Sequence, residues 1–289
     1  MVIDKIINTL LLPETAYGYR AMTYSLQHEG FIINHKKVYR LMDKYQLLGD
    51  RHQQAARSYV KYRRVSPKRP LEVLEMDIKF QWVAEHQRYA FILTVIDCFT
   101  RKVHFWSVGY SIKQAQVKAA WEYIIVNDLQ PAGLLENQLT LELRNDNDTR
   151  FAAKSVQKYF EDNHINQVFT HPYTPQENGH IESFHSILGR SLDKKEFATL
   201  SDLEKHLNYF YEVYNNVRLH GSIQHLNPNA FLRLWEQKQV IVRPHKKQKH
   251  RYEIRLKVPH YMIKQNGEIR QLSDETIEMI GRRTCTLNT

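Results

Sequence analysis

Three carboxylates, Asp77, Asp146 and Glu182, stand where acidic side chains could do metal chemistry. Asp77 lies among apolar residues in a strand-like stretch, where a carboxylate is costly unless it faces an open edge or a cation. Asp146 directly follows a second strand-like run, and Glu182 lies in the first turn of an expected helix. Converging carboxylates repel one another, so such a cluster is stable chiefly around hard divalent cations. We therefore predict that the three side chains meet at one end of a sheet.

Nearby acidic residues have competing structural roles. Asp146 itself lies in an Asn-Asp-Asn-Asp run, so forming a turn is its alternative role. Glu177 competes with Glu182, but it lies in a turn, so we expect it to be solvated. For Asp97, at the end of a strand, we favour capping of the turn toward Thr100 and Arg101 over metal binding.

The elements that must position the carboxylates follow from the apolar periodicity. Their order, βββ, α, β, α, β, α, α, predicts an α/β fold with a mixed five-stranded sheet flanked by helices. The expected strands cover residues 71–83, 88–99, 102–110, 139–143 and 166–170. The expected helices cover residues 111–128, 152–164, 181–193 and 202–216. The first of these helices is expected to bury Ile112, Ala115, Ala119 and Tyr123.

Two short helices precede this core. Residues 17–29 read as a helix that ends at Gly30, and Asn34 is the expected N-cap of a second helix over residues 35–48. A pair of helices joined by a glycine-containing turn indicates a helix-turn-helix, whose second helix could enter a major groove. The cations expected to contact DNA from this helix are Lys36, Lys37, Arg40 and Lys44.

The net charge of +10 is unevenly distributed. Residues 1–70 carry 13 Lys and Arg against 5 Asp and Glu, residues 71–235 carry 16 against 20, and residues 236–289 carry 12 against 6. Basic arms attract phosphate, whereas an acidic middle suits metal-binding carboxylates. Composition alone leaves the partner undecided.

We expect four parts in the chain. A helix-turn-helix domain at residues 1–50 is followed by a basic linker at 51–70, the α/β core at 71–235, and a basic, β-rich region at 236–289 with an Asn-Gly hairpin turn. Arg63 and Arg64 in the linker are further expected DNA contacts. In the last part, Lys246, Lys247 and Lys249 are either DNA contacts or a solvated charge run.

Several motifs taken together resemble one family. They are YGYR at 17–20, NHKKVYRLM at 34–42, VIDCFTRKV at 95–103, DNDTRF at 146–151, TPQENGHIESFHSILGR at 174–190 and YNNVRLHGSIQHLNP at 214–228. Asp146 and Glu182 are separated by 35 residues, the spacing for which this family is known. Over residues 17–234 the chain resembles bacterial insertion-sequence transposases of the DDE and retroviral-integrase superfamily.

This resemblance implies an RNase H-like core in which Asp77, Asp146 and Glu182 are the catalytic residues and bind two Mg²⁺ or Mn²⁺ ions. The ions would activate water for strand nicking and then a 3′-hydroxyl for joining to target DNA. The implied partners are double-stranded DNA, further copies of this chain on that DNA, and a separately encoded upstream helix-turn-helix protein. Family members commonly have glycine where this chain has Asp148, so a catalytically inactive DNA-end-binding or repressor relative is the alternative.

The resemblance leaves several roles open. His185, one turn after Glu182, is either a contact to the scissile phosphate or a surface histidine. Tyr214, Arg218 and His220 either pack and brace the backbone, which we favour slightly, or contact DNA.

Other classes of protein are disfavoured. No stretch approaches the ~20 consecutive apolar residues of a membrane span, and the first residues lack the features of a signal peptide, so we expect a cytoplasmic, nucleoid-associated protein. Cys98 and Cys285 lie far apart and without ligand-spaced neighbours, which predicts ordinary thiols. A ribonuclease H acting on RNA–DNA hybrids is disfavoured by the basic helix-turn-helix arm.

Overall fold

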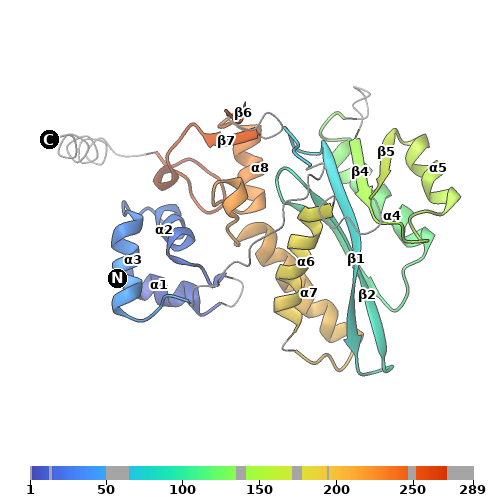
Figure 1. Ribbon diagram of the computed structural model, residues 1–289, viewed down its shortest axis with the longest axis horizontal. Helices are drawn as coiled ribbons and strands as arrows, with labels where there is room; N and C mark the ends of the chain where they lie inside the picture. The colour runs from blue at the N-terminus through green and yellow to red at the C-terminus, as the bar shows by residue number, and fades with distance from the viewer. Residues whose placement is uncertain are drawn as a thin grey trace. The chain divides into compact units, whose positions relative to one another are not determined.

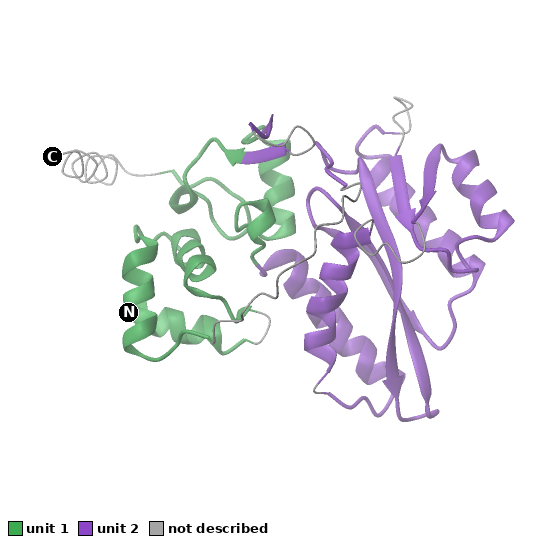
Figure 2. Ribbon diagram, viewed as in Figure 1, with its two compact units in different colours: residues 1–51, 219–241, 255–289 green, residues 52–218, 242–254 purple. Residues whose placement is uncertain are grey.

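The computed structural model describes residues 2–12, 15–49, 65–134, 141–170, 178–193, 195–246 and 252–271. These residues form two compact units (Figure 2). Unit 1 comprises residues 1–51, 219–241 and 255–289, and unit 2 comprises residues 52–218 and 242–254. Within the described ranges, no helix is both long and apolar enough to cross a bilayer.

Unit 2 contains a five-stranded sheet with strand order β3-β2-β1-β4-β5 (Figure 1). The first three strands are antiparallel, whereas β1, β4 and β5 run parallel to one another. The strands are β1 (Val73–Val83), β2 (Arg88–Asp97), β3 (Val103–Gly109), β4 (Leu141–Asn145) and β5 (Ile165–Phe169). This confirms the predicted mixed sheet, and its order and directions are those of an RNase H-like core.

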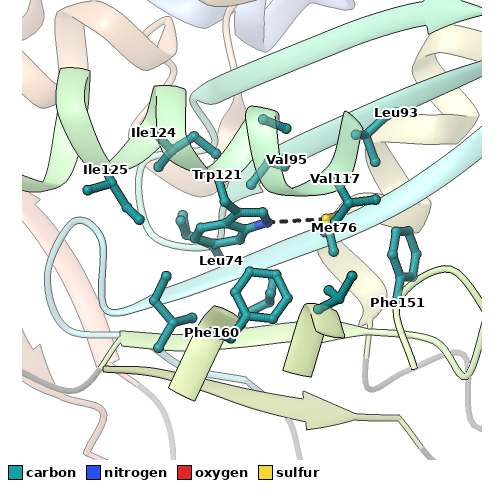
Figure 3. Close-up of a cluster of buried hydrophobic side chains, with 14 of the residues drawn as sticks. Leu74, Met76, Leu93, Val95, Val117, Trp121, Ile124, Ile125, Phe151 and Phe160 are labelled. Atoms are coloured by element: carbon teal, nitrogen blue, oxygen red, sulfur yellow. Dashed lines mark hydrogen bonds between the residues drawn. The ribbon is translucent and has the colours of Figure 1, made fainter. Parts of the chain in front are cut away.

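Alternation along the strands gives the sheet two apolar faces. On one face, β1 contributes Leu74, Met76 and Ile78 to a core shared with α4 (Gln114–Ile124) and α5 (Lys154–Asp162). Trp121 is fully buried there, and its Nε1 donates a hydrogen bond to the Met76 sulfur at 3.3 Å (Figure 3).

The other face carries a second core. Ala90, Ile92 and Ile96 of β2 pack there with buried residues of α6 (Gly179–Leu192) and α7 (Leu200–Asn216). Two helices therefore cover each face, so that α6 lies against the face of β1 opposite to Met76.

The buried face of α4 differs from the prediction. Ala115, Ala119 and Tyr123 are exposed, and only Ile112 of the expected set is buried. The helix instead buries Val117, Ala120, Trp121 and Ile124. This i, i+3, i+4, i+7 stripe carries the larger apolar side chains, whose burial removes more surface from water than two alanines would.

Unit 1 contains the predicted pair of helices, α2 (Tyr19–His28) and α3 (His35–Lys44). Gly30 follows α2 with φ of 99°, a left-handed conformation that favours glycine. The Asn34 side chain accepts a hydrogen bond from Lys37 N at 2.9 Å and so caps α3, as predicted. A further helix, α1 (Val2–Leu10), which the sequence analysis did not anticipate, packs its Ile6 into the same core.

Later segments complete unit 1. Helix α8 (Pro228–Glu236) and the short helix η5 (His260–Met262) belong to unit 1. Strand β6 (Val240–Pro244) pairs with β7 (Tyr252–Leu256), and most of both strands belongs to unit 2. The predicted Asn-Gly turn is present, since Gly267 has φ of 85° and its N–H donates to Lys264 O at 2.9 Å. A Cβ at Gly267 would lie 2.8 Å from Ala230 O, so α8 also requires glycine there.

The end of the described chain packs on α2. The rings of His28 and His260 share a hydrogen bond of 3.2 Å, and Tyr24 stacks on His225. Arg270 donates to the carbonyl oxygens of His28, Tyr261 and Ile263. Burial lowers the pKa of His28 to about 3 and that of His260 to about 4, so both rings are neutral at pH 7.

Candidate active site

Asp77 lies in the middle of β1 on the face covered by α6. Its neighbours Met76 and Ile78 are buried on the opposite face, while its own side chain is 27% exposed. Asp77 Oδ1 accepts a hydrogen bond from Ile78 N at 2.7 Å, and Oδ2 lies 3.3 Å from Nδ1 of His185 on α6. The carboxylate is thus turned toward the helix that carries Glu182.

Asp146 is the first residue after β4, and its side chain is exposed. Strands β1 and β4 are parallel neighbours, and Glu75 is level with Arg144 in their register. Asp77 and Asp146 each lie two residues beyond this last pair, on neighbouring segments of the chain. Asp146 Oδ1 accepts a hydrogen bond from Asp148 N at 3.1 Å.

Glu182 lies in the first turn of α6 and is exposed. Burial of part of the side chain raises its pKa, and the negative charges of Asp77 and Glu75 raise it further. The pKa of Asp146 is likewise raised, first by burial and then by the charges of Asp77 and Asp148. Asp77 therefore acts electrostatically on both other carboxylates of the predicted trio.

The charge of Asp77 acts on both Asp146 and Glu182, but the ligand atoms of these three carboxylates do not form one tight cluster. Within the described ranges, the group of three whose ligand atoms all lie within 4.8 Å is Glu75, Cys98 and His180. Residues Asp77, Asp146 and Glu182 would each offer a carboxylate to a cation. The donor set consists of carboxylate oxygens, which hard cations such as Mg²⁺ and Mn²⁺ prefer.

Asp148 is neutralised by a neighbour. Arg150 donates to both of its carboxylate oxygens, with Nε lying 2.7 Å from Oδ1. This pairing lowers the pKa of Asp148. The backbone of Asp148 does not adopt a positive φ, so glycine is not required at this turn. The departure from glycine is thus accommodated in both charge and conformation.

Glu75 is a residue of this region that sequence reasoning missed. It lies two residues before Asp77 on the same face of β1 and is fully buried, and this burial raises its pKa to about 7. Its Oε2 accepts a hydrogen bond from Ile181 N at 2.7 Å, and its Oε1 lies 2.9 Å from His180 Nδ1. The available signal was the alternation of β1, which places residues 75, 77 and 79 on one face.

The structure also bears on other polar residues of the core. Asp97 is fully buried and accepts hydrogen bonds from Phe99 N at 2.9 Å and Thr100 Oγ1 at 2.6 Å, which confirms its predicted turn-capping role. Tyr214 is buried against Phe184, with ring centroids 4.9 Å apart. The half-buried Arg218 is close enough for its charge to act on the Tyr214 hydroxyl.

The residues expected to contact DNA from α3 are all exposed. Val38 and Met42 face the core of unit 1 and are fully buried, while the opposite surface of α3 carries Lys36, Lys37, Arg40 and Lys44. Lys246 is also exposed. The expected contacts Arg63 and Arg64 lie outside the described residues, as do Glu177, Lys247, Lys249 and Cys285.

Sequence relatives are insertion-element proteins. The chain is 26% identical over 217 residues to the 39.2 kDa protein of insertion element IS476 from Xanthomonas euvesicatoria, covering 74% of this chain and 60% of that protein. It is 24% identical over 217 residues to the 31.7 kDa protein of insertion element IS407 from Burkholderia multivorans, covering 74% of this chain and 75% of that protein.

Solved structures with a partial likeness are catalytic domains. The catalytic domain of Mos1 mariner transposase has a TM-score of 0.41 and 14% identity, over 49% of this chain and 70% of that chain. The HTLV-2 integrase catalytic core domain, solved in complex with magnesium, has a TM-score of 0.38 and 18% identity, over 55% of this chain and 92% of that chain.

Family matches cover both units. Residues 67–175 and residues 163–228 each match an Integrase core domain family, and residues 4–55 match an HTH-like domain family. The predicted resemblance to insertion-sequence transposases is thereby confirmed. The chain belongs to the integrase core domain family and carries an HTH-like domain ahead of that core.

Proposed function

We propose that this protein is a DDE transposase, a metal-dependent polynucleotidyl transferase that cuts and joins the DNA strands of a mobile element. The observation that carries the proposal is the charge of Asp77, which raises the pKa of both Asp146 and Glu182. Three acidic side chains from separate elements are stable together when cations neutralise them. The family membership of the chain supports the same activity.

In this proposal Asp77, Asp146 and Glu182 would hold two Mg²⁺ or Mn²⁺ ions. When bound, such ions supply charge stabilisation for the attacking and leaving oxygens of phosphoryl transfer. The carboxylates act as ligands and not as nucleophiles. His185, 3.3 Å from Asp77, orients that carboxylate from α6.

DNA is the proposed substrate and partner. The helix-turn-helix domain at residues 1–50 would bind the element ends through α3, and the core at 71–235 would carry out the joining. The basic linker at 51–70 and the β-rich region at 236–289 would add phosphate contacts. Joining two ends to one target requires more than one copy of the chain on the DNA, and we place this activity at the bacterial nucleoid in the cytoplasm.

The test is a strand-transfer assay with a duplex that carries the element end and a recessed 3′ end. We expect joining in Mg²⁺ or Mn²⁺ and its loss in Glu182→Gln, with DNA binding retained because Glu182 belongs to unit 2 and α3 belongs to unit 1. Joining by Glu182→Gln at the wild-type rate would remove Glu182 from the site. A wild-type chain that shifts the duplex but never joins it would instead be the DNA-end-binding relative.

A further inference from the structure

We propose that Glu75 is a positioning residue that fixes Glu182 relative to Asp77 by tying the start of α6 to β1. The inference deepens the proposed function and rests on it, since Asp77 and Glu182 matter only as ligands of the same pair of cations. It assigns a role to a buried carboxylate that neither binds a substrate nor faces solvent.

The hydrogen bond from Ile181 N to Glu75 takes the place of an N-cap hydrogen bond at the start of α6. The first N–H groups of a helix have no partner within the helix, and the N-cap side chain usually accepts one of them. Asn178, the N-cap of α6, makes no such hydrogen bond. Glu75 takes its place from the neighbouring strand, because its Oε2 accepts from Ile181 N at 2.7 Å and its Oε1 lies 2.9 Å from His180 Nδ1.

This placement couples the two metal-binding carboxylates. Glu75 and Asp77 are two residues apart on β1, which is about 6.6 Å along a regular strand. Ile181 and Glu182 are adjacent on α6. The buried hydrogen bond between Glu75 and Ile181 N therefore fixes the position of the Glu182 backbone relative to β1, and so relative to Asp77.

The contacts run along the whole helix. Glu75 meets α6 at His180 and Ile181, and Asp77 meets it at His185. Lys79 Nζ lies 3.4 Å from where a Cβ at Gly189 would be. The four steps from residue 75 to 79 on β1 span about 13 Å, and the nine steps from residue 180 to 189 on α6 span about the same length. Helix α6 therefore runs along β1. Glu75 holds the end of this helix that carries Glu182.

The cluster around Glu75 is explained by hydrogen bonds and does not require a bound metal ion. Glu75, Cys98 and His180 are of the types that bind zinc, and their ligand atoms lie within 4.8 Å of one another. However, Oε2 of Glu75 already accepts a hydrogen bond from Ile181 N, and Oε1 shares a hydrogen bond with His180 Nδ1. The Cys98 thiol is hydrogen-bonded to the same carboxyl group. Burial raises the pKa of Cys98 well above its usual range, which keeps the thiol protonated as a donor. The network is satisfied by hydrogen bonds alone.

The experiment measures Mn²⁺ binding to the full-length chain without DNA, by electron paramagnetic resonance, alongside Mn²⁺-dependent joining. We expect Glu75→Ala to bind Mn²⁺ about tenfold more weakly, the equivalent of ~1.4 kcal/mol and the size expected for losing one buried hydrogen bond to a charged group. Glu75→Gln keeps an oxygen that can accept from Ile181 N, so it should recover most of the affinity. Glu72→Gln is the matched control, because Glu72 lies just before β1 and its carboxylate accepts a hydrogen bond from Lys68 N.

The outcomes are distinguishable. Equal Mn²⁺ affinity in wild type and a folded Glu75→Ala overturns the positioning role, whether or not joining occurs. Should Glu75→Ala not fold, His180→Ala removes one donor of the tie, and an unchanged affinity there overturns it equally. A wild-type chain that binds Mn²⁺ and loses this binding in Glu182→Gln, yet never joins DNA, would refute the transferase while leaving the role of Glu75 intact.

Discussion

The exposed cations of α3 allow a quantitative prediction about DNA binding. Replacing Lys36, Lys37, Arg40 and Lys44 together by glutamine leaves Val38 and Met42 in the core and keeps the backbone cap at Asn34. Each Lys or Arg that neutralises a phosphate contributes about 0.9 to the slope of log affinity against log salt concentration. Four such contacts contribute roughly 3.6, which is a factor of about 150 between 50 and 200 mM salt.

The assay is fluorescence anisotropy of a labelled duplex, titrated with protein at several salt concentrations in that range. We expect the slope of the fourfold variant to be shallower than that of wild type by about 3.6. Arg40→Gln alone should reduce the slope by about 0.9. Lys5→Gln is the matched control, since Lys5 lies on α1 and pairs with Glu29 at 3.1 Å. Slopes that are the same in wild type and the fourfold variant would refute a role for α3 in DNA binding.

Two further predictions concern stability. The folded pKa of His28, about 3, lies below its ordinary 6.5, so its contribution to stability is complete above pH 6.5 and is lost as the pH falls toward 3. At pH 5 the loss from His28 is ~2 kcal/mol, and His260, with its pKa of about 4, adds its own loss over the same range. Hydrogen exchange of α2 peptides should therefore show a loss in His28→Gln that is ~2 kcal/mol smaller than in wild type. Trp121→Ala should lower the free energy of unfolding of unit 2 by ~3–5 kcal/mol, measured by urea denaturation, because Trp121 is fully buried. A loss below 1 kcal/mol would show that the core around Met76 is not packed as described.

The features that sequence predicted well are those set by local chemistry. The cap at Asn34, the left-handed Gly30 and the Asn-Gly turn all depend on residues within a few positions of one another. The order of strands and helices along the chain, and the mixed five-stranded sheet, followed from apolar alternation together with the resemblance to a known family. The positions of Asp77 and Asp146 at neighbouring strands follow from the same pattern, because β1 and β4 are parallel partners.

The features that sequence did not predict depend on distant partners. Glu75 is buried because Ile181 and His180 meet it, more than a hundred residues later. Arg270 bonds to the carbonyl oxygen of His28, a backbone group that has no signature in sequence. The error on α4 arose because two apolar stripes compete on one helix, and the stripe with Trp121 is the one that packs into the core of unit 2.

Unit 1 is built from segments that lie far apart in the sequence, and this affects its folding during synthesis. Helices α1, α2 and α3 are translated well before the segment that covers α2, which includes His260 and Arg270. The helix-turn-helix of a nascent chain therefore lacks its cover while the core of unit 2 is already able to fold. A polypeptide cut short before residue 255 would keep all four helices of the core and still leave one side of α2 bare to chaperones and proteases.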